Sequence, residues 1–111
     1  MGERDFQAAY GAIVIDQTGR VLVREVAGSH DGYRHSFSQG HRAPDETPEE
    51  TARRMTLEQT GWSAEVLDRI PGAFWSGNGK AIYFLARPIE QVADQGWKTS
   101  GVSFVAPDRA M

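Results

Sequence analysis

The chain has 111 residues, of which 40% are hydrophobic and 24% are charged, and its formal net charge is −3. This length and composition predict one globular domain over residues 1–111 with a modest core. The negative charge argues against a nucleic-acid polymer or an anionic membrane as partner, and the absence of cysteine excludes disulfides, thiolate metal ligands and a cysteine nucleophile.

The N-terminal third predicts strands. Residues 8–15 form an apolar run that indicates a buried strand, and residues 20–26 form a second, β-branched one. Because residues 17–19 read as a turn between them, we expect the two strands to pair as a hairpin. After a loop over residues 27–32, the alternation over residues 33–38 predicts a short third strand.

A helix with well-marked ends follows. Thr47 suits the N-cap, Pro48 the first helical position, and Glu50 lies three residues after Thr47, which completes a capping box. Gly61 offers a left-handed stop at the far end. Between these residues the helix has few apolar side chains, too few for an ordinary core-facing stripe, so we expect something other than burial to explain its composition; the apolar residues are Ala52, Met55 and Leu57.

The remainder again predicts strands. These are the alternating stretch 63–70, a short strand at 73–75, a strong strand at 81–86 and a last strand at 101–105, with a Gly-rich turn at 76–80 and an irregular polar segment at 87–99. Strands on both sides of one strong helix indicate an α+β or α/β sandwich with a mixed sheet. Pro107 and Asp108 read as the start of a further helix.

The stretch from Gly40 to Trp62 resembles the Nudix box of the Nudix hydrolases. That box runs Gly, five residues, Glu, seven residues, Arg-Glu-apolar-any-Glu-Glu, any, Gly, apolar. Six positions of this chain keep the register: Gly40, Glu46, Arg54, Glu58, Gly61 and Trp62. Three depart from it, since Met55 and Gln59 stand where Glu belongs and Thr56 replaces an apolar residue. Upstream, Ser-Gln-Gly at 38–40 replaces the common Pro-Gly-Gly.

The resemblance covers residues 8–106 and implies a Nudix-type α/β/α sandwich. Family members usually continue into a further helix that packs on the sheet, and in this sequence that helix is expected to be missing or only begun. One sheet face would then be under-covered, which favours a homodimer. No apolar run reaches membrane-spanning length and no signal peptide is evident, so we expect a cytoplasmic location and no membrane partner.

The function that the resemblance implies is metal-assisted hydrolysis of a nucleotide or another diphosphate-linked small molecule, with Mg²⁺ or Mn²⁺. Positions 55, 58 and 59 fall within roughly 100° of helical arc, so their side chains share one patch. The resemblance makes Glu58, Gln59 and the carbonyl of Gly40 the candidate metal ligands, and Glu58, Arg54 and Glu46 the candidate catalytic residues.

Each of these roles has a structural alternative. Glu58 is either a ligand or a solvated carboxylate, Met55 is a packing residue, and Glu46 and Arg54 are expected to brace the loop against the helix. Spacing also predicts an ion-pair ladder through Glu50, Arg54 and Glu58. Two functions therefore remain open: a hydrolase with weakened metal binding, and a non-catalytic Nudix-fold module that binds a ligand or a protein.

Weaker candidates lie outside the box. Glu90 and Asp94 could add a carboxylate but read better as solvated charges, and the histidines lack metal-ligand spacing. The aromatic residues could stack on a base but are more typical of a core, and the 76–80 turn could hold a phosphate but reads better as a plain hairpin. The histidines are His30, His35 and His41, and the aromatic residues are Phe37, Phe74, Trp75 and Trp97.

Overall fold

The computed structural model describes residues 8–27, 33–76, 79–93 and 101–106. Its elements are, in chain order, β1 (Ala9–Val14), β2 (Val21–Ala27), β3 (Tyr33–Ser36), β4 (Ser38–His41), α1 (Pro48–Thr60), β5 (Trp62–Arg69), β6 (Phe74–Ser76), β7 (Gly79–Gln91) and β8 (Gly101–Val105). No described helix has the length and apolarity that crossing a membrane requires.

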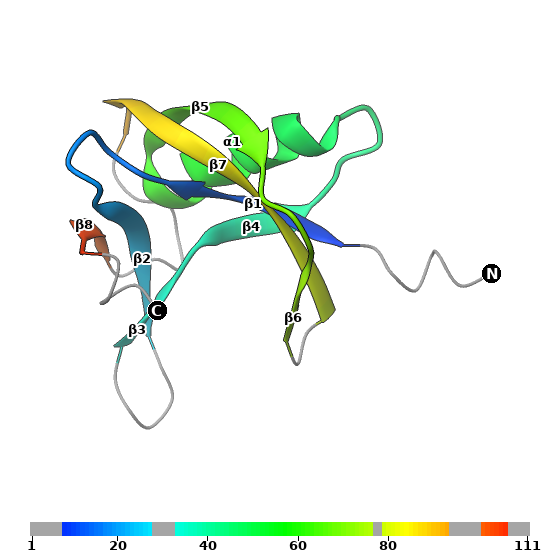
Figure 1. Ribbon diagram of the computed structural model, residues 1–111, viewed down its shortest axis with the longest axis horizontal. Coiled ribbons are helices and arrows are strands. Elements are labelled where there is room, and N and C mark those ends of the chain that lie inside the picture. Colours follow the sequence, from blue (N-terminus) through cyan, green and yellow to red (C-terminus); the bar gives the residue numbers. More distant parts are fainter. Residues whose placement is uncertain (1–7, 28–32, 77–78, 94–100, 107–111) are drawn as a thin grey trace.

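A five-stranded mixed sheet carries the helix. Its strand order is β4-β1-β7-β5, with β6 also paired to β7. The β1–β7 pair is parallel and the other pairs are antiparallel. Helix α1 lies across one face of this sheet, and a smaller antiparallel sheet of β3, β2 and β8 stands beside it (Figure 1). The architecture is α+β, as the sequence predicts.

The core forms where the alternating side chains of the sheet meet α1. Ile82, Phe84 and Ala86 point to this side from β7, because successive strand residues face opposite ways. They pack with apolar residues of neighbouring segments, four of which are alanines: Ala8, Ala12, Val14, Leu22, Ala52 and Ala64. Such small side chains let the helix lie close to the sheet, which fixes the position of the box.

Three sequence expectations about the strands are wrong. β1 and β2 do not form a hairpin, since they belong to different sheets and share one isolated bridge between Ile15 and Val21. The strand expected over 33–38 is divided at Phe37 into β3 and β4, which also belong to different sheets. β7 continues to Gln91, although residues from 87 were expected to be irregular, because its polar end pairs with β5.

Only one helix is found in the part of the chain that the structure describes, and it covers one face of the mixed sheet. The helix start expected at Pro107 and Asp108 lies outside the described residues. The second helix layer of the expected α/β/α sandwich therefore stays a prediction.

Candidate functional site

The ends of α1 are fixed as the sequence predicts. Thr47 is the N-cap, and its hydroxyl accepts a hydrogen bond from the backbone N–H of Glu50 at 3.1 Å, while the Glu50 carboxylate accepts one from the N–H of Thr47 at 2.9 Å. Gly61 adopts φ 77°, and its N–H donates to the carbonyl of Leu57 at 2.9 Å. These bonds satisfy backbone groups that a helix end leaves free.

Helix α1 buries one side although few of its residues are apolar, so the expectation that it lacks a core-facing stripe is wrong. Its buried residues are Thr51, Ala52, Met55, Thr56 and Thr60. The buried threonine hydroxyls donate to carbonyls one turn earlier, from Thr56 to Ala52 at 2.9 Å and from Thr60 to Thr56 at 2.6 Å. A hydroxyl satisfied in this way can be buried at little cost.

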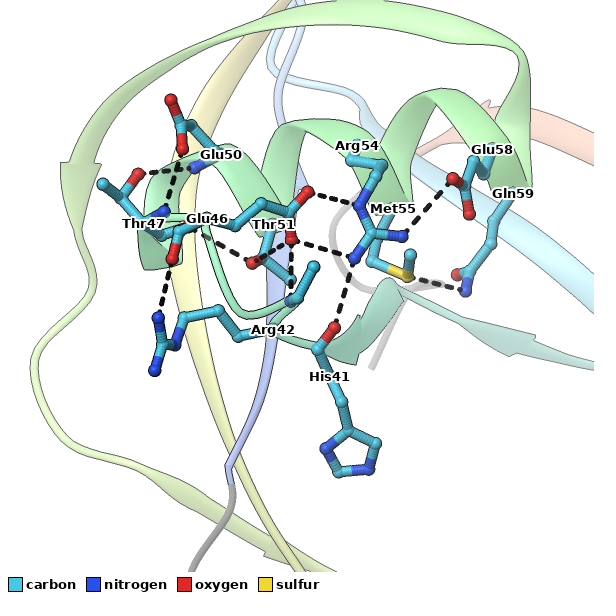
Figure 2. Close-up of polar contacts among 11 residues, drawn as sticks. His41, Arg42, Glu46, Thr47, Glu50, Thr51, Arg54, Met55, Glu58 and Gln59 are labelled. Carbon is cyan, nitrogen blue, oxygen red and sulfur yellow. Dashed lines mark hydrogen bonds and ion pairs between the residues drawn. The ribbon is translucent and has the colours of Figure 1, made fainter.

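The carboxylate of Glu46 joins residues 42–47, the box loop, to the helix (Figure 2). It accepts hydrogen bonds from the backbone N–H of Ala43 at 3.0 Å, from the hydroxyl of Thr51 at 2.8 Å and from both Nε and Nη2 of Arg54. Chiefly because of the bond from Arg54, the pKa of Glu46 falls from its ordinary value of 4.5 to about 2. The carboxylate is thus held charged in a structural role, which confirms the predicted brace.

Arg54 is the centre of this network. Besides Glu46, its guanidinium reaches the backbone carbonyl of His41 at 3.2 Å and the carboxylate of Glu58 at 3.3 Å. The hydrogen bonds to Glu46, and then to Glu58, raise the pKa of Arg54 above its ordinary value. The predicted ladder is confirmed only in part, since the carboxylate of Glu50 caps the helix instead.

The three positions of the predicted cation patch lie on one side of α1, but only one carries a carboxylate (Figure 2). The Glu58 side chain is 56% exposed and pairs with Arg54. The Gln59 amide is turned towards β4: its Nε2 donates to the carbonyl of Gln39 at 2.9 Å, and its Oε1 accepts from the N–H of Gln39 at 3.1 Å. Nε2 also lies 3.5 Å from the sulfur of Met55.

Met55 packs directly against the box glycine. It is 8% exposed, and a Cβ atom built on Gly40 would lie 2.1 Å from its Sδ and 3.0 Å from its Cγ. Only a residue without a side chain fits there while Met55 keeps this position. The structure thus places Gly40, Met55 and Gln59 together where β4 meets the helix.

The family model for the NUDIX domain matches residues 5–110. The chain belongs to the Nudix family. Solved structures with the same fold include a NUDIX hydrolase from Nitrosomonas europaea (TM-score 0.77, 17% identity, 92% of this chain and 58% of that one). The chain therefore spans less than two thirds of that relative. No curated protein matches the sequence.

Two further Nudix-fold structures carry named activities. An ADP-ribose pyrophosphatase from Streptococcus suis aligns with a TM-score of 0.74 and 15% identity over 93% of this chain and 75% of its own. An Ap4A hydrolase from C. elegans aligns with a TM-score of 0.68 and 16% identity over 92% and 82%. At this identity the likeness shows the fold.

Nudix membership implies a divalent cation, and the side chains of this box do not fit one well. Mg²⁺ and Mn²⁺ prefer oxygen ligands, chiefly carboxylates. Met55 offers a thioether. Both the oxygen and the nitrogen of the Gln59 amide are already hydrogen-bonded to the backbone of Gln39. Among the residues that the structure describes, no three His, Cys, Asp or Glu side chains gather as a metal site would require. Glu58 is the one anionic group left on the patch.

The weaker candidates do not join the box. Glu90 is exposed on β7 opposite Ser63, and the aromatic rings of Phe37 and Phe74 pack on Tyr83 with centroids 5.8 and 5.5 Å apart. Trp75 is 66% exposed, at the tip of the β6–β7 pair with Lys80 over its ring. His41 contributes its backbone carbonyl to Arg54. His30, Asp94, Trp97 and positions 77–78 of the Gly-rich turn lie outside the described residues, as does the side chain of His35.

Sequence reasoning missed Gln39 and Thr51. Gln39 contacts Gln59 through its backbone N–H and C=O, and the two residues are 20 positions apart. No local sequence pattern predicts a contact of this kind. Thr51 could have been found, because it lies one turn after the N-cap Thr47 and faces back towards Glu46.

A hollow of about 460 Å³ lies beside this network. Acidic, basic and apolar side chains line it, including Glu46, Arg53, Arg54, Leu57 and Ile89.

Proposed function

We propose that this protein is a Nudix hydrolase of nucleotides or other diphosphate-linked small molecules whose box supports only slow metal-dependent turnover. The observation that carries the proposal is the retained brace of Glu46 and Arg54 beside a patch with Glu58 as its one carboxylate. The substrate class comes from the names of the Streptococcus suis and C. elegans neighbours.

The residues of the box take distinct proposed roles. Glu58 would be the anionic ligand of a bound cation, with the Gly40 carbonyl and the Gln59 amide oxygen as neutral ligands, and Arg54 would orient Glu58 while it holds Glu46. A cation that used Gln59 would compete with the hydrogen bonds to Gln39, so we expect weak binding of Mg²⁺ or Mn²⁺. If the missing carboxylates cost about 4 kcal/mol of transition-state stabilisation, the rate falls about a thousandfold.

The test is release of phosphate or pyrophosphate from a panel of nucleoside diphosphate derivatives, with Mg²⁺ or Mn²⁺ in excess. Glu58→Gln is the matched control because it keeps the size of the side chain and removes its charge. We expect slow turnover by the wild-type protein that the control lacks. Equal rates for the two proteins would refute a hydrolase built on this box.

The second candidate is a non-catalytic Nudix-fold module that binds a ligand or another protein chain. The bonding of both atoms of the Gln59 amide to Gln39 favours it, because that side chain already has partners. Restoring the carboxylates with Met55→Glu and Gln59→Glu discriminates the two. Calorimetry should then show tighter Mg²⁺ binding by the double variant than by the wild type. If turnover appears only in the double variant, the wild-type protein is better described as a non-catalytic binding module. A homodimer and a cytoplasmic location stay predictions.

A further inference from the structure

The edge of the mixed sheet at β4 is closed by a side chain instead of a strand. β4 pairs with β1 on one side. On its other side the N–H and C=O of Gln39 would be free, as on any edge strand. The amide of Gln59 bonds both groups, accepting from the N–H at 3.1 Å and donating to the C=O at 2.9 Å. It thus makes the two hydrogen bonds that a neighbouring strand would otherwise make to Gln39.

Met55 completes the contact from the preceding turn of the helix. Its sulfur lies 3.5 Å from the amide nitrogen of Gln59 and packs against Gly40, the residue after Gln39. The two side chains that stand where the Nudix box has glutamate therefore hold two consecutive residues of β4. One does so by hydrogen bonds and the other by close packing.

We propose that Gln59 and Met55 form a metal-independent clasp that fixes β4 against α1, at the place where family membership implies a cation. The clasp is defined by the contacts of Gln59 with Gln39 and of Met55 with Gly40. This inference goes beyond the proposed function, since it concerns how the box is held together and is true or false whatever the rate of turnover.

The chemistry of the amide explains why glutamine suits this place and glutamate does not. An amide has both a donor and an acceptor, whereas a carboxylate has acceptors alone. A glutamate at 59 could still accept from the N–H of Gln39. Its second oxygen would face the carbonyl of Gln39 with no proton between them, and the charge would lie beside the sulfur of Met55. Without a cation, the carboxylate is therefore the poorer partner for β4.

The first measurement needs no variant: hydrogen exchange of the Gln39 backbone amide in the wild-type protein, in EDTA and in excess Mg²⁺. We expect this amide to be protected already in EDTA, because its acceptor is Oε1 of Gln59 and not a group that a metal brings into place. Gln59→Ala removes that acceptor and should speed exchange of this amide by about tenfold, while amides in β7 keep their protection. Protection that appears only with Mg²⁺ would overturn the proposal.

The second measurement is the thermal midpoint with and without Mg²⁺. In EDTA, Gln59→Glu should lower Tm by about 4–8 °C, whereas Gln91→Glu, which adds the same charge at an exposed position of β7, should leave it nearly unchanged. Mg²⁺ should raise Tm of the Met55→Glu, Gln59→Glu double variant and should move that of the wild type much less, because the wild-type box binds the cation weakly. A wild-type Tm raised by Mg²⁺ as much as that of the double variant would contradict the clasp.

The two proposals fail separately. Loss of the clasp would show in exchange and in thermal midpoints, whatever the turnover. Equal turnover by the wild type and Glu58→Gln would refute the slow hydrolase and leave the protection of the Gln39 amide as it was.

Discussion

Substitution of Gly40 by alanine tests the close approach of β4 to the helix. The new methyl group would lie 2.1 Å from Sδ of Met55, 3.0 Å from its Cγ and 3.3 Å from its Cε, so the methionine has to leave its present position. Gly40 does not have positive φ, so alanine brings no backbone strain and restricts the unfolded chain, which favours folding by about 0.4–1 kcal/mol. Overpacking of a buried contact costs about 1–3 kcal/mol.

The overpacking term is the larger, so we expect Gly40→Ala to destabilise the protein by about 1–2 kcal/mol. In urea this moves the unfolding midpoint down by about 0.5–1 M at an unchanged slope of about 2 kcal/mol/M. A change of slope instead would point to an altered unfolded or native state.

Met55→Ala provides the control for the cause of this loss. Alone it should cost about 2–5 kcal/mol, because it empties a buried site. In the double variant the methyl group on residue 40 enters the space that Met55 vacates, so the combined loss should be smaller than the sum by about 1–3 kcal/mol. Strictly additive losses, or a Gly40→Ala protein as stable as the wild type, would refute the contact.

The remaining predictions concern the brace and the cap. The pKa of Glu46 is about 2 in the folded protein and 4.5 ordinarily, so its carboxylate contributes stability that is complete above about pH 4.5 and is lost as the pH falls towards 2. Glu46→Gln should therefore flatten the fall of the urea midpoint between pH 4.5 and 2; an unaltered fall would show that other groups cause it. Thr47→Ala removes the N-cap and one half of the capping box, and we expect a loss of about 1 kcal/mol in urea unfolding at pH 7. Thr47→Ser keeps the hydroxyl and should restore most of that loss, and a serine variant as unstable as the alanine variant would refute the capping explanation.

The sequence by itself determined the helix and its local network. Thr47, Glu50 and Gly61 fix the ends of α1 through bonds that span three or four residues. Glu46 and Arg54 are only eight residues apart, and their ion pair spans the N-cap and the first two turns of α1. Bonds of this range follow from spacing and side-chain chemistry, because few alternative partners lie within reach.

Only the tertiary structure decided which strands pair and which groups Met55 and Gln59, the two residues that replace glutamate in the box, contact. The pattern of β1 says that it is buried but not that it lies parallel to β7, because both neighbours offer equivalent backbone groups. Likewise, a glutamine at 59 can face solvent, a cation or a strand. It bonds Gln39 because the small core residues bring α1 close enough to the edge of the sheet for one side chain to reach both free backbone groups of β4.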